Sequence, residues 1–414
     1  MKKPPFKRKL TIAISQTLPV TLLSGALIFP ITSNADDILH ALKQGKTTLS
    51  YRLRFENVSA EDSSKDANAL TLKTRLTWES GFYKHAGFTV EMDDVTALTD
   101  VNYTDGVTAR GTLPIADPES TEINQAFLQY KGFIDTDILY GRQRIILDNQ
   151  RFVGGVGFRQ NEQTYDGLVI ANTSLANTRV IFAHVNNVNR IFGEATAKGD
   201  IETNANMLNI NYRGIEDVNA SAYAYLISYE ASDDTLDTYG ARITGKTILS
   251  GVKTLYTAEF AAQLNGIGPK EYNTAYMHLM AGAKVRGITT KIGLEILGSD
   301  SGVMGFSTPL ATGHKFQGWA DKFLNTPANG VQDMHLKVST KINDIKLVGV
   351  FHNFSAVEPV TDNLGDNYGQ EIGFIVAKKF KAGRIVSLKY ANFIGDRSDY
   401  NDVSKLWLSY SGKI

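Results

Sequence analysis

Apolar and polar residues alternate along this chain with a period of two. The stretch LSYRLRFE (49–56) has apolar residues at its odd positions and polar or charged residues at its even positions. LTLKTRLTWE (70–79) and ITTKIGLEIL (288–297) repeat the alternation. Because successive side chains of a β-strand point to opposite faces, each stretch predicts a strand with one apolar and one charged face.

About eighteen such segments are recognisable, and their lengths near ten residues fit strands that cross a membrane. Four of them have poor phase, so a count of sixteen also stays open. Short linkers alternate with long polar ones, which is typical of an outer-membrane barrel. The predicted strands start near residues 47, 69, 86, 122, 136, 164, 177, 205, 219, 237, 252, 273, 287, 332, 344, 369, 384 and 403.

Two soluble alternatives fit the pattern less well. A β-sandwich rarely needs eighteen long strands in one unit. A β-helix would show a short sequence repeat, and none is visible. The chain also has 18 tyrosines, several near segment ends, as interfacial girdles require. The predicted fold class is all-β: a transmembrane antiparallel β-barrel with long extracellular loops and inward-folded loop segments.

The N-terminus predicts export. A basic start, MKKPPFKRK, precedes a largely apolar stretch and a small-residue cleavage site after Ala35. We expect residues 1–35 to be a cleaved signal peptide, 36–45 a short periplasmic segment and 46–414 the barrel. The chain has no cysteine, which agrees weakly with an oxidising compartment. The expected location is the outer membrane.

Removal of the signal peptide makes the chain acidic. It takes away five basic residues and leaves 38 Lys and Arg against 43 Asp and Glu. This balance argues against a nucleic-acid partner. The expected surroundings are membrane lipid, lipopolysaccharide and the outer-membrane assembly machinery.

If the apolar face meets lipid, the charged face must meet water. A Lys or Arg toward the bilayer midplane costs about 2–4 kcal/mol, and a barrel of sixteen to eighteen strands encloses an aqueous lumen. The predicted inner face is about two to one basic, which favours anions at a constriction. The alternative is that its charges merely pair across neighbouring strands. The strand residues predicted to line the pore are Arg52, Arg54, Arg75, Arg142, Arg144, Arg179, Arg213, Arg242 and Lys291.

The first stretch that breaks the alternation is YGRQRIILDNQRFVGGVGFRQNEQTYDG (140–167). Its glycine run is not followed by a helix or a Walker lysine, so a phosphate loop is a poor interpretation. We expect a loop that folds inward and presents arginines to the lumen, with Arg151 and Arg159 joining Arg142 and Arg144. Because the guanidinium donors match carboxylates, sugar acids are a reasonable ligand class.

The second such stretch is MGFSTPLATGHKFQGWADKFLNTPANG (304–330). Phe316, Trp319 and Phe323 recur at helical spacing between two prolines. One interpretation is a short helix that packs a long loop against the barrel. The other is an aromatic patch on which a sugar ring stacks.

These two stretches resemble the signature segments of alginate-export-like outer-membrane porins. The matching patterns are RQ…DNQRF…G…RQNEQT…D and TPLAT.H.F.GWAD.F, and the likeness in layout spans nearly the whole mature chain. The resemblance implies an eighteen-stranded barrel that passes anionic polysaccharide or related small anionic solutes. It also implies that Arg142, Arg144, Arg151 and Arg159 line the conduit, with Trp319 and Asp321 in the later loop. The closing isoleucine departs from the aromatic ending usual for barrels.

Other chemistry finds little support in the sequence. The seven histidines show no HExxH or other close metal spacing, and no G-x-S-x-G elbow is present. We expect no metal, no cofactor and no enzymatic activity. A barrel enzyme of the lipase or protease type and a surface receptor or adhesin remain as alternatives. The solute, the direction of transport and the choice between monomer and trimer are left open.

Overall fold

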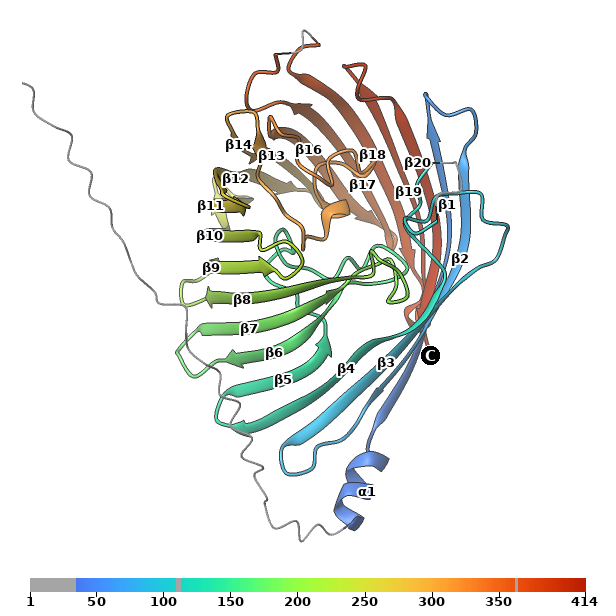
Figure 1. Cartoon of the computed structure of the whole chain (residues 1–414), viewed down its shortest axis with the longest axis vertical. Coiled ribbons are helices and arrows are strands. Elements are labelled where there is room, and N and C mark those ends of the chain that lie inside the picture. The colour runs from blue at the N-terminus through green and yellow to red at the C-terminus, as the bar shows by residue number, and fades with distance from the viewer. Residues whose placement is uncertain (1–34, 109–112, 362–363) are drawn as a thin grey trace, which may run out of the picture.

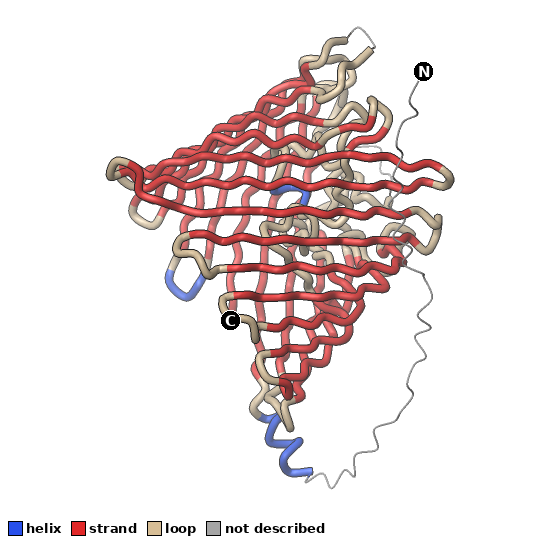
Figure 2. Tube along the Cα trace, turned by 90° about the vertical axis from the view of Figure 1, so that its left-hand side faces the viewer, coloured by secondary structure: helices blue, strands red, loops and turns tan. Residues whose placement is uncertain are grey.

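The structure is a closed antiparallel barrel of eighteen strands. It is a computed structural model and describes residues 35–108, 113–361 and 364–414. Neighbours in sequence pair in antiparallel fashion, and the first strand, β1 (Lys46–Ala60), also pairs with the last, β20 (Val403–Lys413), which closes the ring. Figure 1 shows this ring around two loops that lie inside it. Figure 2 shows the strands of the wall lying side by side.

The predicted strand count and fold class are confirmed. The other barrel strands are β2 (Ala67–Glu79), β3 (Ala86–Ala97), β4 (Ser120–Phe133), β5 (Thr136–Gln143), β6 (Thr164–Asn172), β7 (Thr178–Asn189), β8 (Asp200–Tyr212), β9 (Val218–Tyr229), β10 (Thr235–Leu249), β11 (Val252–Ile267), β12 (Lys270–Val285), β13 (Ile288–Leu297), β16 (Val331–Ile342), β17 (Ile345–Ser355), β18 (Asn367–Lys379) and β19 (Ile385–Gly395). The short elements are α1 (Ala35–Lys43), β14 (Ser299–Asp300), β15 (Met304–Gly305), η1 (Gly313–Lys315) and η2 (Lys381–Gly383).

Tight turns at the periplasmic end fix the register of the hairpins. The β10–β11, β12–β13 and β16–β17 turns each have two central residues with positive φ, as in Ser250 (50°) and Gly251 (77°). Two-residue hairpin turns with this geometry match the right-handed twist of the strands. The connections at the opposite end are longer, apart from the β11–β12 link.

The two faces of the wall have the predicted character. Leu76, Leu128 and Ile292 are exposed on the outer face, where hydrocarbon would cover them. Buried charges such as Glu56 and Glu295 occupy the inner face. The period-two alternation therefore separates a lipid-facing surface from an enclosed polar one.

Two segments leave the wall and fold into the lumen. We call residues 144–163, between β5 and β6, inner loop 1, and residues 298–330, between β13 and β16, inner loop 2. Inner loop 2 is the orange segment with the short helical turn inside the ring of Figure 1. The expected inward folding is confirmed, whereas the short helix expected around residues 316–324 is wrong. That stretch is irregular because Gln317, Gly318 and Asp321 have positive φ.

The segment before the barrel contains α1, next to the periplasmic end of β1 (Figure 1). The expected signal peptide lies outside the described residues, except for Ala35, the first residue of α1. No helix within the described part of the chain is long and apolar enough to cross a membrane.

Candidate functional site: the constricted lumen

Inner loop 1 is attached to distant parts of the barrel wall. Arg159 forms an ion pair with Glu56 on β1 at 3.1 Å. Arg151 forms another with Glu295 on β13 at 2.8 Å. Both arginines are almost fully buried. The loop therefore narrows the lumen, and these two guanidinium groups hold it in place instead of projecting freely into water.

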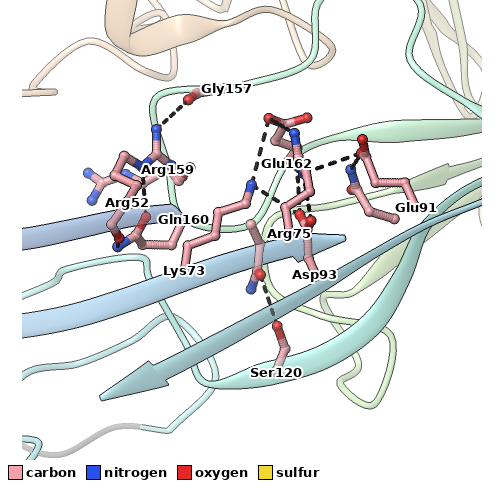
Figure 3. A network of polar contacts seen from close by, with 12 residues as sticks. Arg52, Lys73, Arg75, Glu91, Asp93, Ser120, Gly157, Arg159, Gln160 and Glu162 are labelled. Carbon is pink, nitrogen blue, oxygen red and sulfur yellow. Dashed lines mark hydrogen bonds and ion pairs between the residues drawn. The ribbon is translucent and has the colours of Figure 1, made fainter. Parts of the chain in front are cut away.

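A charged network joins the same loop to β2 and β3 (Figure 3). Arg75 donates two hydrogen bonds of 2.6 Å to Asp93 and one of 3.0 Å to Glu162 of the loop. Lys73 lies 3.0 Å from Asp93 and 3.7 Å from Glu162. Because Lys73 and Arg75 are spaced i, i+2 on β2, both side chains reach the lumen and meet the loop carboxylate from one face.

Glu162 is the central acid of this network. Arg144, at the start of inner loop 1, bonds both Glu162 and Glu91 of β3. Burial alone would raise the pKa of Glu162, but Lys73, Arg75 and Arg144 outweigh it and hold the pKa well below its usual value. Glu162 is thus a permanently charged anchor between the loop and the wall at neutral pH.

Arg52 holds the loop backbone in a different way. Its guanidinium donates to the Gly157 carbonyl at 2.9 Å, to the Gln160 side-chain oxygen at 2.8 Å and to the Arg159 carbonyl. Within the described part of the chain, no carboxylate lies within salt-bridge distance of Arg52. Arg54 instead faces Asp117, at 3.6 Å, and stacks over Phe158.

Inner loop 2 reaches the same region from the opposite side of inner loop 1. Asp321 lies 2.8 Å from Lys405 of β20 and 3.3 Å from Arg159. It also accepts a 2.6 Å hydrogen bond from His314, whose ring stacks on Phe158. Burial lowers the pKa of His314 to about 3, so the imidazole is neutral at ordinary pH.

Inner loop 2 is anchored further by backbone groups. Glu371 of β18 accepts hydrogen bonds from the backbone N–H groups of Trp319 and Ala320. The indole of Trp319 is buried against the wall, with the Lys389 ammonium 4.2 Å from its ring centre. Trp319 therefore packs against β18 and β19 and is not an open platform for a sugar ring.

The two inner loops also bond directly to each other. Gly154 donates to the Leu310 carbonyl at 2.9 Å, and Thr312 donates to the Gln150 carbonyl at 3.1 Å. The Tyr165 hydroxyl at the start of β6 donates to the Gly154 carbonyl at 2.8 Å. These contacts make the loops a single unit inside the barrel.

Basic side chains line two adjoining cavities near the periplasmic turns. The first has a volume of about 750 Å³ and is lined by Arg179, Arg213 and Arg242, with Asp148 as its acid. The second, about 620 Å³, shares Arg213 and Arg242 and adds Lys291. Arg242 pairs with Glu259, whereas Arg179, Arg213 and Lys291 have no ion pair within the described residues.

Arg142 departs from the expected lumen position. It follows two residues after Tyr140, whose side chain is 65% exposed on the outer face, and its partners are Asp166 and Glu194. Alternation placed Arg142 and Arg144 on the same inner face. Because β5 ends at Gln143, Arg144 is already in the loop and turns inward independently.

The lumen contains functional residues that the sequence analysis did not select. Asp117 binds the Gln160 backbone N–H at 2.7 Å, and Glu162, His314 and Glu371 tie the inner loops to one another or to the wall. Glu162 stands inside the quoted RQNEQT pattern, so its position was available as a signal. The contact of Asp117, from a different loop, has no linear signal.

A closed barrel with an apolar outer face, a charged interior and loops that narrow the lumen defines an outer-membrane channel of the porin type. The chain belongs to the alginate export family, whose model matches residues 44–288. No curated protein matches the sequence significantly.

Solved structures of other porins have the same fold. Pseudomonas aeruginosa OpdK, determined with vanillate, is 14% identical with a TM-score of 0.71, covering 90% of this chain and 99% of its own. P. aeruginosa OccK9 (OpdG) is 14% identical, with a TM-score of 0.70 and the same coverage. Acinetobacter baumannii OccAB1 is 13% identical, with a TM-score of 0.69, covering 90% and 98% of the two chains. At these identities the likeness shows the fold alone.

Proposed function

We propose that this outer-membrane channel passes small or polymeric solutes and favours anions, carboxylate-bearing saccharides such as uronic-acid oligomers among them. The observation that carries the proposal is the set of unpaired basic groups in the two cavities. Arg179, Arg213 and Lys291 have no carboxylate partner among the described residues, while the charges at the inner loops are largely paired. A solute carboxylate would find free donors there and not in the network around Glu162.

The acidic residues in these cavities neutralise only part of the positive charge, because their partners are other residues. Asp148 accepts hydrogen bonds from Asn209 and Asn211, at 2.6 and 3.2 Å. Asp217 pairs with Lys246 at 2.8 Å. The remaining positive charge attracts anions, and weak contacts at several sites allow them to leave again.

The solute class is supported by chemistry and by analogy. Guanidinium groups bind carboxylates through paired N–H donors. Vanillate, present in the OpdK structure, is a small carboxylate, and we extend that class to this channel only as a proposal. The proposed activity is passage through the lumen after export and removal of residues 1–35, with no covalent chemistry.

Measurement of reversal potentials in planar bilayers tests the proposal. Under a KCl gradient the purified barrel should show an open pore that prefers chloride. Replacing both Arg179→Gln and Arg213→Gln should shift the reversal potential toward cation preference, because two unpaired charges leave the cavity. Both side chains lack ion pairs in the described structure, so the change leaves no buried carboxylate without a partner.

Arg142→Gln is the control, since it makes the same type of substitution and removes one positive charge from the outer face. Its reversal potential should equal that of the unmodified barrel. An unchanged potential in the Arg179 and Arg213 double variant would refute the proposed anion site. A barrel that conducts no current would refute the channel itself and favour the enzyme or receptor alternatives.

A further inference from the structure

A cluster of two histidines and one aspartate lies on the lumen side of two neighbouring strands. Asp333 and His335 are spaced i, i+2 on β16, so both project from the same face. His352 on β17 is the residue paired directly with His335. Sheet pairing thus brings together three side chains that are up to 19 residues apart in sequence.

The possible ligand atoms of the cluster are close enough together to share one metal ion, with the His335 distance at the spacing expected for ligands and the His352 distances at hydrogen-bond length. His352 Nδ1 lies 2.9 Å from both carboxylate oxygens of Asp333, and His335 Nδ1 lies 3.6 Å from one of them. One possible ligand atom from each residue lies within 4.8 Å of the others. With bonds of about 2.0–2.2 Å, ligand atoms around a tetrahedral ion stand roughly 3.3–3.6 Å apart.

Hydrogen bonding within the protein accounts for only part of the cluster. The contact between Asp333 and His352 is a hydrogen bond, but His335 Nδ1 is buried and has no hydrogen-bond partner in the described structure. His278 Nδ1, in the ring next to His335, is also buried without one. Because buried polar groups are normally satisfied, two such nitrogens beside a carboxylate indicate a missing partner.

The surroundings hold the cluster in shape and place carboxylates on both sides of it, of which Glu295 is paired with Arg151. A Cβ on Gly293 would lie 2.3 Å from His335 Nε2, so the imidazole lies directly against this glycine of β13. Glu295 and Glu371 are the cross-strand neighbours of Asp333 and His352. The side chain of Asp333 is 1% exposed, that of His352 9% and that of His335 16%, so a ligand reaches the cluster from the His335 side.

We propose that Asp333, His335 and His352 bind a divalent transition-metal ion of the zinc type. Imidazole and carboxylate ligands suit Zn²⁺, Co²⁺, Ni²⁺ and Cu²⁺, whereas Mg²⁺ prefers oxygen ligands. The ion would join β16 to β17 close to inner loop 2. The proposal replaces the expectation of no metal site, which rested on linear spacing and took no account of cross-strand pairs.

Calorimetric titration of the full-length barrel, purified without a histidine tag, tests the site. Zn²⁺ should bind at one saturable site, and Mg²⁺ in excess should not compete. His335→Ala and His352→Ala should each weaken Zn²⁺ binding at least tenfold. Gly293→Ala should weaken it as well, because the added methyl group displaces the His335 ring.

Asp333→Asn covers the case in which a histidine variant does not fold, because it keeps the shape of the side chain. His40→Ala, in the exposed part of α1, is the matched control and should bind Zn²⁺ as the unmodified barrel does. Bound Zn²⁺ should also raise the unfolding temperature of the unmodified barrel more than that of Asp333→Asn. Absence of saturable binding would overturn the proposal, and so would a Zn²⁺ affinity in Asp333→Asn and His335→Ala equal to that of the unmodified barrel.

Discussion

Single charged residues in the lumen act through their partners. Glu162 is surrounded by Lys73, Arg75 and Arg144, and none of these basic groups is free to bind solute while Glu162 is ionised. Removing one member of a buried ion pair leaves an uncompensated charge, which costs about 3–5 kcal/mol. The ion pairs around Glu162 therefore hold inner loop 1 in place. They leave no free basic group to attract an anionic solute.

Glu162→Gln should loosen inner loop 1 and increase both the conductance and the current noise of single channels at pH 7. The depressed pKa of Glu162 means that its stabilisation is fully present above the ordinary glutamate value of about 4.3. The stabilisation is lost as the pH falls below that value toward the lower pKa of the folded state. The difference between variant and unmodified barrel should accordingly shrink in strong acid.

Glu194→Gln is the control for this prediction, because Glu194 also pairs with an arginine, Arg142, but has no ion pair with inner loop 1 among the described residues. Its conductance should match that of the unmodified barrel at every pH. A Glu162→Gln channel with unaltered conductance at pH 7 would show that the carboxylate does not anchor the loop.

Residue positions were predictable in strands with regular alternation, and positions around the irregular end of β5 were not. Arg52, Arg54 and Arg75 lie in regular stretches of β1 and β2, and their inward direction follows from alternation. Alternation does not apply across the end of β5, which is why Arg142 and Arg144 have opposite directions. Whether a given arginine would be paired depends on loop carboxylates such as Asp117, which no local pattern places.

The strands could be predicted closely from the sequence. Each strand has lipid on one face and the polar lumen on the other, and this imposes the alternation of apolar and polar residues. The predicted starts lie within five residues of the observed ones throughout, for example 86 against Ala86 and 205 against Asp200. The inner loops were recognisable as breaks in the alternation. Their internal conformation was not, because residues with positive φ, such as Gln317, replaced the helix that the aromatic spacing indicated.

The contact between the two inner loops leads to a prediction at this scale. A Cβ on Gly154 would lie 2.4 Å from Thr312 Oγ1 and 2.7 Å from the Gln150 Cβ, so Gly154→Ala cannot fit without separating the loops. Overpacking of this kind costs about 1–3 kcal/mol. Gly154→Ala should increase single-channel conductance and make inner loop 2 more sensitive to added protease.

Gly155→Ala provides a control at the adjacent position. Its Cβ would meet only the Gln163 carbonyl oxygen, at 3.6 Å, which is an ordinary contact. We expect conductance and protease resistance equal to those of the unmodified barrel. Equal behaviour of the two alanine variants would mean that the loops do not depend on this contact.

At the scale of the whole molecule, the lipid outside and the water inside determine the residue pattern of the wall. The pairing of neighbouring strands determines which side chains meet in the lumen. A hydrocarbon exterior and a hydrated interior impose the period of two on all eighteen strands, so a single sequence suffices to predict the barrel. The belt of Arg242, Glu259, His278, Glu295 and Asp333 instead arises because these residues are successive partners on β10 to β16. Such a set becomes visible only when the register of every hairpin is known.

The three tryptophans test the assignment of the two faces in one experiment. Trp78 shares the outer face of β2 with Leu76 and packs against Phe88, whereas Trp319 and Trp407 are buried inside the barrel. In vesicles of lipid with brominated acyl chains, fluorescence of a variant that keeps only Trp78 should be strongly quenched. Variants that keep only Trp319 or only Trp407 should be quenched far less, because the wall separates them from the acyl chains. Strong quenching of either inner tryptophan, with Trp78 unaffected, would place hydrocarbon on the charged face. That result would reject the assignment of the two faces, on which the cavities, the inner loops and the metal cluster all depend.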